Sequence, residues 1–144
     1  MPVHDPLTER ILAAVFKVST GLGVGFSEKV YENALVHELT KDGLRVEQQK
    51  GLEVWCDDLV VGNFAADLLV EGQVLVELKS VKALDDMHMA QALNYLRASG
   101  LGVCLLVNMG IAKPEIRRLV PGKDWKPVRK EIETGEEQLS LIHI

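Results

Sequence analysis

The sequence predicts a single α/β domain in which a mixed sheet is flanked by helices. Three observations lead to this fold class: two segments with helical spacing of apolar residues open the chain, a series of short alternating segments follows, and a third helical segment separates that series from two final strands. The expected order of elements is α-α-β-β-β-β-α-β-β. At 144 residues the chain has the length of one domain, and it contains no internal repeat.

The N-terminal region is predicted to form two helices. Apolar residues recur at helical spacing over residues 7–20, after Pro6, which suits the first turn of a helix, and before a glycine-rich stop at residues 21–23. The second helix is expected to begin near Ser27, a good N-cap, and to end at Gly43, because glycine suits the left-handed residue that follows a helix. Both helices therefore precede the whole sheet.

The central part of the chain alternates between apolar and polar residues as strands do. Asp57-Asp58 is predicted to form a turn, and Glu71-Gly72 is a strong signal for a tight hairpin. The strands expected around these two turns are residues 44–49, 52–56, 63–70 and 73–79, with the sheet resuming at residues 59–61.

A third helix and two more strands complete the predicted domain. The helix is expected to begin at Asp85 or Asp86, either of which can cap it, and to end at Ser99-Gly100. Residues 103–107 are continuously apolar, which is typical of a strand buried on both faces. A short strand over residues 116–120 should end the compact part of the chain.

The domain is expected to span residues 1–122, and residues 123–144 are expected to form a basic C-terminal extension. The last six residues, 139–144, match the translation of a transposon-end adaptor used in sequencing libraries. We hypothesise that the reading frame ran into adaptor sequence, and these six residues are therefore excluded from the functional argument.

The charge of the chain is unevenly distributed. The net charge of −5 argues against tight, indiscriminate binding to nucleic acid, since neutralising phosphates requires basic residues. Residues 113–130, however, contain seven basic residues against two acidic ones. That stretch can contact a phosphate backbone or can equally be a solvated surface, and both interpretations stay open.

Other features of the sequence bear on location and redox chemistry. Its apolar runs are far shorter than the ~20 residues that cross a bilayer, and it does not open with a secretory signal pattern, so we expect a cytoplasmic protein with no membrane partner. Cys56 and Cys104 are far apart and form no C-x-x-C pair, which predicts two reduced and largely buried thiols.

Three charged residues lie in the otherwise apolar hairpin around Glu71-Gly72. Alternation places Glu77 and Lys79 on one face of the second strand, and Asp67 lies among apolar residues of the first. Buried carboxylates are too costly to leave unpaired, so they either form a partly buried salt bridge with Lys79 or hold a metal. Two carboxylates on adjacent strands can share one Mg²⁺ or Mn²⁺, and a nearby lysine can orient the attacking water or stabilise charge on a phosphate.

Two further patterns accompany this hairpin. The segment from Gly25 to Tyr31 has the form G-x-x-E-x-x-Y with Glu28 at its centre, and Gln91 and Tyr95 lie one helical turn apart in the third predicted helix. Together with the acidic hairpin, these motifs resemble the GxxExxY family, a branch of the PD-(D/E)xK nuclease superfamily. The resemblance covers approximately residues 11–120, and the chain departs from the pattern at Ala65, where relatives often carry a basic residue.

The resemblance implies a restriction-endonuclease-like core with a metal in a cleft beside the hairpin. By that likeness Asp67 and Glu77 would bind the metal directly, the carbonyl of Leu78 would be a third ligand, and Glu28 would complete the acidic cluster from its helix. Lys79 would act on the nucleophilic water. Gln91 would steady the active-site groups. Tyr95 would contact substrate or support the site.

The sequence thus leads to the hypothesis of an Mg²⁺- or Mn²⁺-dependent nuclease that hydrolyses phosphodiester bonds of DNA or RNA. One alternative is a catalytically inactive nucleic-acid-binding or regulatory module that keeps the fold, which the acidic body and the scarcity of aromatic residues favour. A further alternative is a subunit of a homodimer or larger complex that is inactive alone. His88, although near the site in sequence, is interpreted as a surface residue.

Overall fold

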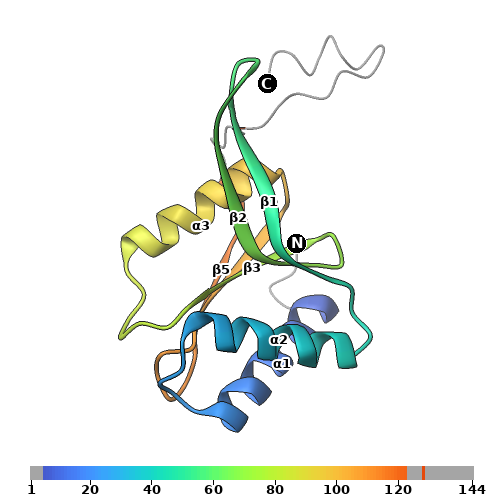
Figure 1. Cartoon of the computed structure of the whole chain (residues 1–144), viewed down its shortest axis with the longest axis vertical. Coiled ribbons are helices and arrows are strands. Elements are labelled where there is room, and N and C mark those ends of the chain that lie inside the picture. Colours follow the sequence, from blue (N-terminus) through green and yellow to red (C-terminus); the bar gives the residue numbers. More distant parts are fainter. Residues whose placement is uncertain (1–4, 123–127, 129–144) are drawn as a thin grey trace.

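The computed structural model of the protein describes residues 5–122 and residue 128, and it forms one mixed sheet with helices on both faces (Figure 1). The strands lie in the order β1-β2-β3-β4-β5, and all neighbours are antiparallel except β3 and β4, which are parallel. The predicted α/β fold class is confirmed. The elements are α1 (Pro6–Leu22), α2 (Glu28–Lys41), β1 (Val46–Cys56), β2 (Leu59–Val70), β3 (Val74–Lys79), α3 (Asp86–Ser99), β4 (Val103–Asn108) and β5 (Glu115–Leu119).

The structure has three strands before α3 and not the four that the alternation predicted. The two predicted strands at residues 44–49 and 52–56 form one strand, β1, which begins at Val46. Its pairing with β2 skips Gln49, resumes with Lys50 opposite Ala66, and shifts register between Val54 and Trp55. Gln49 adopts a left-handed φ of 54°, which removes a single residue from the ladder without ending the strand. Residues 59–61 and 63–70 are likewise continuous in β2.

Helices α2 and α3 begin after residues that the sequence predicted as N-caps, and α1 begins at Pro6 after a cap, Asp5, that it did not predict. Asp5 caps α1 by accepting from the backbone N–H of Thr8 at 2.9 Å, and α1 ends at Leu22, slightly later than expected. Ser27 is the N-cap residue of α2, and Asp85 rather than Asp86 caps α3. The α3 cap is reciprocal, because His88 accepts from the backbone N–H of Asp85 through Nδ1 at 3.1 Å.

The hairpin between β2 and β3 has the tight turn that Glu71-Gly72 predicted. Both residues have positive φ, 54° and 65°, and the N–H of Gln73 donates to the carbonyl of Val70 at 3.0 Å. Positive φ at two successive residues is a feature of the primed turns that suit the twist of paired strands. Val70 pairs with Val74, so three residues, 71–73, connect the strands, and this connection sets which residue of β3 lies opposite each residue of β2.

The two faces of the sheet are covered differently. On one face, α1 and α2 bury a continuous core that includes Leu68, Val76, Leu78 and Leu105 from the strands. On the other face, α3 covers a smaller cluster with Leu75 and Leu106 at its centre. Every residue of β4 is buried, as expected for a strand covered on both faces. Figure 1 shows the paired β1 and β2 extending beyond the remaining strands.

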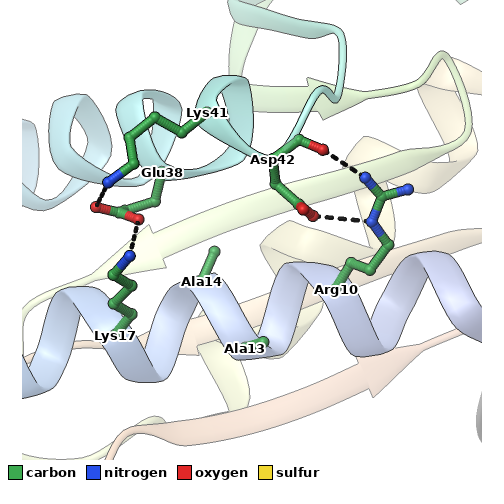
Figure 2. Close-up of a pocket in the computed structure, with 7 residues that line it drawn as sticks. All are labelled: Arg10, Ala13, Ala14, Lys17, Glu38, Lys41 and Asp42. Atoms are coloured by element: carbon green, nitrogen blue, oxygen red, sulfur yellow. Dashed lines mark hydrogen bonds and ion pairs between the residues drawn. The ribbon is translucent and has the colours of Figure 1, made fainter.

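Ion pairs join α1 to α2 across a pocket of about 420 Å³ on their outer side (Figure 2). Arg10 donates through Nε to the Asp42 carboxylate at 2.8 Å and through its terminal nitrogen to the Asp42 carbonyl at 2.6 Å, so it satisfies a carbonyl at the C-terminal end of α2. Glu38 lies between Lys17 at 3.1 Å and Lys41 at 3.4 Å. The charged groups here are paired with one another, which gives this pocket a structural role.

The structure corrects the expectation for one of the two cysteines. Cys104 is buried as predicted, but Cys56 is exposed, because it is the last residue of β1, at the tip of the extended hairpin. Within the described residues, no helix is both long enough and apolar enough to cross a membrane. The predicted basic extension and the adaptor-like residues 139–144 lie outside the described part of the chain, except for Val128.

Candidate active site

Asp67 and Glu77 come together where β2 and β3 separate. Regular pairing of these strands reaches Leu68 opposite Val76, and at the next position side chains replace the backbone ladder. The N–H of Leu78 donates to Asp67 Oδ2 at 2.8 Å, and the N–H of Asp67 donates to Glu77 Oε2 at 3.2 Å. Each carboxylate therefore accepts a backbone hydrogen bond from the other strand, and the two side chains are held beside one another.

The Glu77 carboxyl group lies in an electrostatically unfavourable environment. Its side chain is buried, and Oε1 has no hydrogen-bond partner among the described residues. Burial, and secondly the neighbouring negative charge of Asp67, raise the pKa of Glu77 to about 9. A bound cation would remove both penalties, since it would give Oε1 a partner and neutralise the repulsion between the carboxylates.

Lys79 lies on the same side of β3 as Glu77. Its Nζ donates to the side-chain oxygen of Gln91 in α3 at 3.2 Å. In the part of the chain that the structure describes, Lys79 forms no ion pair with Asp67 or Glu77, so the simple salt bridge left open by the sequence is not what the structure shows. The amine is instead positioned by Gln91, close enough for its charge to oppose the rise in the pKa of Glu77.

Tyr95 completes the α3 side of this group. It lies one helical turn after Gln91, and the pKa of its hydroxyl is raised, first by burial and then by the charges of Glu77 and Asp67. Its ring stacks on Phe64 of β2 with centroids 4.2 Å apart and planes 17° from parallel. The structure therefore brings Gln91 and Tyr95 to the acidic pair from one face of α3.

The loop between α1 and α2, residues 23–27, is held in place by Tyr31 of α2. The Tyr31 hydroxyl donates to the carbonyl of Gly23 at 2.6 Å and accepts from the N–H of Phe26 at 3.3 Å. Gly25 adopts a φ of 106°, which few other residues tolerate. Ser80, directly after Lys79, donates to the carbonyl of Phe26 at 3.2 Å. Gly25 and Tyr31 thus fold the loop, and Ser80 ties the loop to the end of β3.

The structure does not bring Glu28 into the acidic group. Glu28 is exposed in the first turn of α2, whereas Glu32, one turn later on the helix, is buried at 4% exposure. Gln49 donates through Nε2 to Glu32 Oε1 at 2.8 Å and to Asp67 Oδ1 at 3.3 Å, and so links the two carboxylates. Glu32, and not Glu28, is therefore the α2 residue connected to the site.

Sequence reasoning missed both Glu32 and Gln49, but only Glu32 had a signal. Glu32 shares the spacing of Leu35 and Leu39, so an acidic residue lies on the apolar stripe of α2, which indicates a buried carboxylate. The role of Gln49 depends on its left-handed conformation inside β1, which no local pattern indicates.

The loop after Lys79 is clamped to the end of β4 by Asn108. This fully buried side chain accepts from the N–H groups of Val81 and Gly110 at 3.0 and 2.9 Å, and donates to the Val81 carbonyl and to Glu115 Oε1, both at 3.0 Å. The same Glu115 oxygen accepts from the N–H of Leu84 at 3.0 Å. The clamp fixes the start of α3 relative to β3, and so fixes Gln91 relative to Lys79.

The donor set suits a hard divalent cation in part. Within residues 5–122, no group of three acidic, histidine or cysteine side chains is placed to hold an ion. Mg²⁺, however, is commonly held by one or two carboxylates together with water and substrate phosphate oxygens. Asp67 and Glu77, with the unpartnered Oε1, meet that requirement.

Comparison with known proteins agrees with this arrangement. The family model described as "PD-(D/E)XK nuclease superfamily" matches residues 5–119, which is most of the chain. No curated protein and no solved structure matches. A mixed sheet with a carboxylate pair and a lysine at the end of its central hairpin, together with a family match over this length, shows that the chain belongs to the PD-(D/E)XK nuclease superfamily.

Proposed function

We propose that the protein is a metal-dependent nuclease that hydrolyses phosphodiester bonds of DNA or RNA. The observation that carries this proposal is the pairing of Asp67 with the buried Glu77, whose Oε1 has no partner in the described structure, beside Lys79 in a chain of the nuclease superfamily. A carboxylate held in this state is stabilised by a cation, and a cation between two carboxylates is a binding point for a phosphate oxygen.

Asp67 and Glu77 would hold Mg²⁺ or Mn²⁺, and the carbonyl of Leu78 is proposed as a third ligand. Such an ion, when bound, lowers the pKa of a coordinated water and polarises the phosphate. The Leu78 N–H already binds Asp67 at 2.8 Å, so the backbone here is fixed relative to the carboxylate. Glu32 would act through Gln49, which holds Asp67 Oδ1 in place.

Lys79 is proposed to orient the attacking water and to stabilise the charge that develops on the phosphate. The hydrogen bond from Lys79 to Gln91 restricts the amine to the α3 side of the acidic pair, where substrate would lie. Tyr95 supports the site through its stacking on Phe64. We also propose that the chain belongs to the GxxExxY branch of the superfamily, on the strength of Gly25, Glu28 and Tyr31, with Glu28 at the exposed rim.

The test is nuclease activity of the purified protein with Mg²⁺ or Mn²⁺ on single- and double-stranded DNA and RNA. We expect Asp67→Asn, Asp67→Ala and Lys79→Ala to lower the rate about 10²-fold or more, because each removes a group that acts on the reacting phosphate or water. The matched controls are Asp58→Asn at the hairpin tip and Lys17→Ala on the outer side of α1, which should keep the parent rate. Unchanged cleavage in the Asp67 and Lys79 variants would contradict the proposed site.

Calorimetric titration with Mn²⁺ separates a nuclease from an inactive nucleic-acid-binding module. We expect one ion to bind the parent protein. Asp67→Ala and Glu77→Ala should lose this binding, and the control Asp58→Asn should keep it. Nucleic-acid binding without Asp67-dependent metal uptake would identify the inactive module instead. Size-exclusion chromatography at several concentrations tests the proposed homodimer or larger complex.

A further inference from the structure

A groove of about 590 Å³ lies between α3 and the extended part of β1 and β2. Its walls include Phe64 from β2 and His88, Gln91, Asn94, Tyr95 and Arg97 from one face of α3. In Figure 1, α3 lies alongside the paired β1 and β2. The volume is within the range of pockets that hold small organic ligands, and it is large enough for a nucleoside.

The groove is continuous with the candidate active site because two residues belong to both. Gln91 accepts the hydrogen bond from Lys79. The pKa of the Tyr95 hydroxyl is raised by burial and also by the charges of Glu77 and Asp67. A ligand in the groove would therefore lie directly beside the position proposed for the phosphate. This adjacency limits the groove to a part of the substrate that is covalently close to the reacting group.

The groove also differs in charge from the rest of the protein. The chain carries a net charge of −5, and the neighbouring site contributes two carboxylates, yet the described residues that line the groove include no Asp or Glu. Arg97 supplies a positive charge, and its guanidinium donates to the Asn94 side-chain oxygen at 3.2 Å. A negatively charged strand would meet less repulsion here than beside the two carboxylates of the neighbouring site.

The aromatic pair supplies a flat and rigid wall. Phe64 and Tyr95 stack on one another, so each ring is held in place by the other before any ligand arrives. Nucleobases stack on such aromatic side chains whatever their sequence, while amides such as those of Gln91 and Asn94 can hydrogen-bond to base edges. The groove therefore combines the two contacts by which proteins bind an unpaired base.

We propose that this groove binds an unpaired nucleobase of the substrate, next to the phosphate at the active site, with Phe64 as its stacking surface and Asn94 and Arg97 as its polar contacts. The position of the phosphate rests on the proposed nuclease function. A base inside a duplex is already paired and stacked, so it would first have to leave the helix to enter. The substrate is thus a single strand or a frayed end in preference to an intact duplex.

The test is the binding of a 12-nucleotide single strand that contains the fluorescent base 2-aminopurine, compared with the matching blunt duplex, in a chelator that prevents cleavage. We expect the single strand to bind more tightly and its fluorescence to be quenched by stacking. Phe64→Leu should weaken binding about ten-fold and reduce the quenching, and Phe64→Tyr should restore both. Phe16→Leu, an exposed phenylalanine on α1, is the matched control and should bind as the parent does.

The results separate the subsite from the nuclease function. Binding that depends on Phe64, in a protein without metal-dependent cleavage, supports the subsite and overturns the nuclease proposal. Cleavage with no effect of Phe64→Leu on affinity or strand preference overturns the subsite alone, as does equal affinity for strand and duplex or no binding of either. If Phe64→Leu does not fold, Asn94→Ala, an exposed change, tests the same groove and should weaken binding about three-fold.

Discussion

The two faces of the sheet use the same strands for different purposes. The α1–α2 face is closed by two helices over a continuous apolar core, whereas the α3 face carries a smaller cluster and, at its end, Glu77 and Lys79. Strand β3 contributes to both, because alternation sends Val76 and Leu78 to the first face and the two charged residues to the second. One face holds the larger part of the apolar core, and the other accommodates unfavourable charge.

This division makes the register of β3 a condition of function. A slip of one residue would move Glu77 and Lys79 into the apolar core and expose Val76 and Leu78 on the α3 side. The connection at residues 71–73 on one side and the parallel pairing of Lys79 with Asn108 on the other both oppose such a slip. The apolar residues of β3 therefore position the charged ones.

The sharpest comparison of the two faces uses neighbouring residues of β4. Leu105 and Leu106 are both fully buried, the first on the α1–α2 face and the second on the α3 face. We expect Leu105→Ala to lower the free energy of unfolding by about 3–5 kcal/mol and Leu106→Ala by about 2–3 kcal/mol, because the smaller cluster can relax around the cavity. Urea unfolding of both variants measures the difference, and a larger cost for Leu106→Ala would contradict the division.

Gly110 tests the clamp that joins β3 to α3. A Cβ at this position would collide with the backbone of Val81, so Gly110→Ala must displace the loop after Lys79. We expect Gly110→Ala to lower the free energy of unfolding by about 1–3 kcal/mol. The folded fraction of the variant should also cleave more slowly than the parent. Gly62→Ala in β2 meets nothing within 4 Å and is the control. A Gly110→Ala protein with unchanged Tm and rate would show that the clamp is dispensable.

Glu77 tests the cost of charge on the α3 face. Its pKa of about 9 in the folded protein lies above the ordinary value of 4.5, so the folded state binds the proton more tightly, and stability present below pH 4.5 is lost as pH rises toward 9. In a chelator, the parent should lose on the order of 1 kcal/mol per pH unit between pH 6 and 8. Glu77→Gln should lose much less, and thermal unfolding across this range measures both.

One result would contradict this prediction: a stability that changes with pH equally in the parent and in Glu77→Gln. The Glu77 carboxyl group would then not destabilise the folded protein as pH rises. Addition of Mn²⁺ should raise the Tm of the parent at pH 8 and leave that of Glu77→Gln nearly unchanged.

The smallest effect is expected on the outer side of the α1–α2 face. The Arg10–Asp42 pair is half exposed, so Arg10→Gln should cost about 0–1 kcal/mol, with the difference reduced at high salt. Chemical unfolding at low and high ionic strength measures it. A loss of several kcal/mol would mean that the ion pairs in Figure 2, and not the apolar core, hold α1 to α2.

Local chemistry explains why much of the fold could be predicted. Glu71-Gly72 identified the hairpin, and the alternation of Glu77 and Lys79 placed both on one face. The continuity of β1 could not be predicted, because residues 47–51 are polar or glycine and interrupt the alternation of apolar residues. The position of Glu32 on the apolar stripe of α2 indicated a buried carboxylate, but its link to Asp67 through Gln49 and the stacking of Phe64 on Tyr95 depend on how distant elements pack, and so only the structure reveals them.

The two acidic residues should have different fates in a descendant that loses the activity. The Leu78 N–H donates a hydrogen bond to Asp67, and this bond matters to the fold whether or not a metal binds. Both carboxylates replace a missing backbone partner between the strands, but Glu77 is buried and its Oε1 has no hydrogen-bond partner in the described structure. A descendant that no longer needed the chemistry would become more stable by replacing Glu77 with a neutral acceptor such as glutamine, which removes the buried charge and can still accept from the Asp67 N–H. At position 67 it would still need an acceptor such as asparagine, so a silent copy of this protein should be recognisable by which acid it has lost.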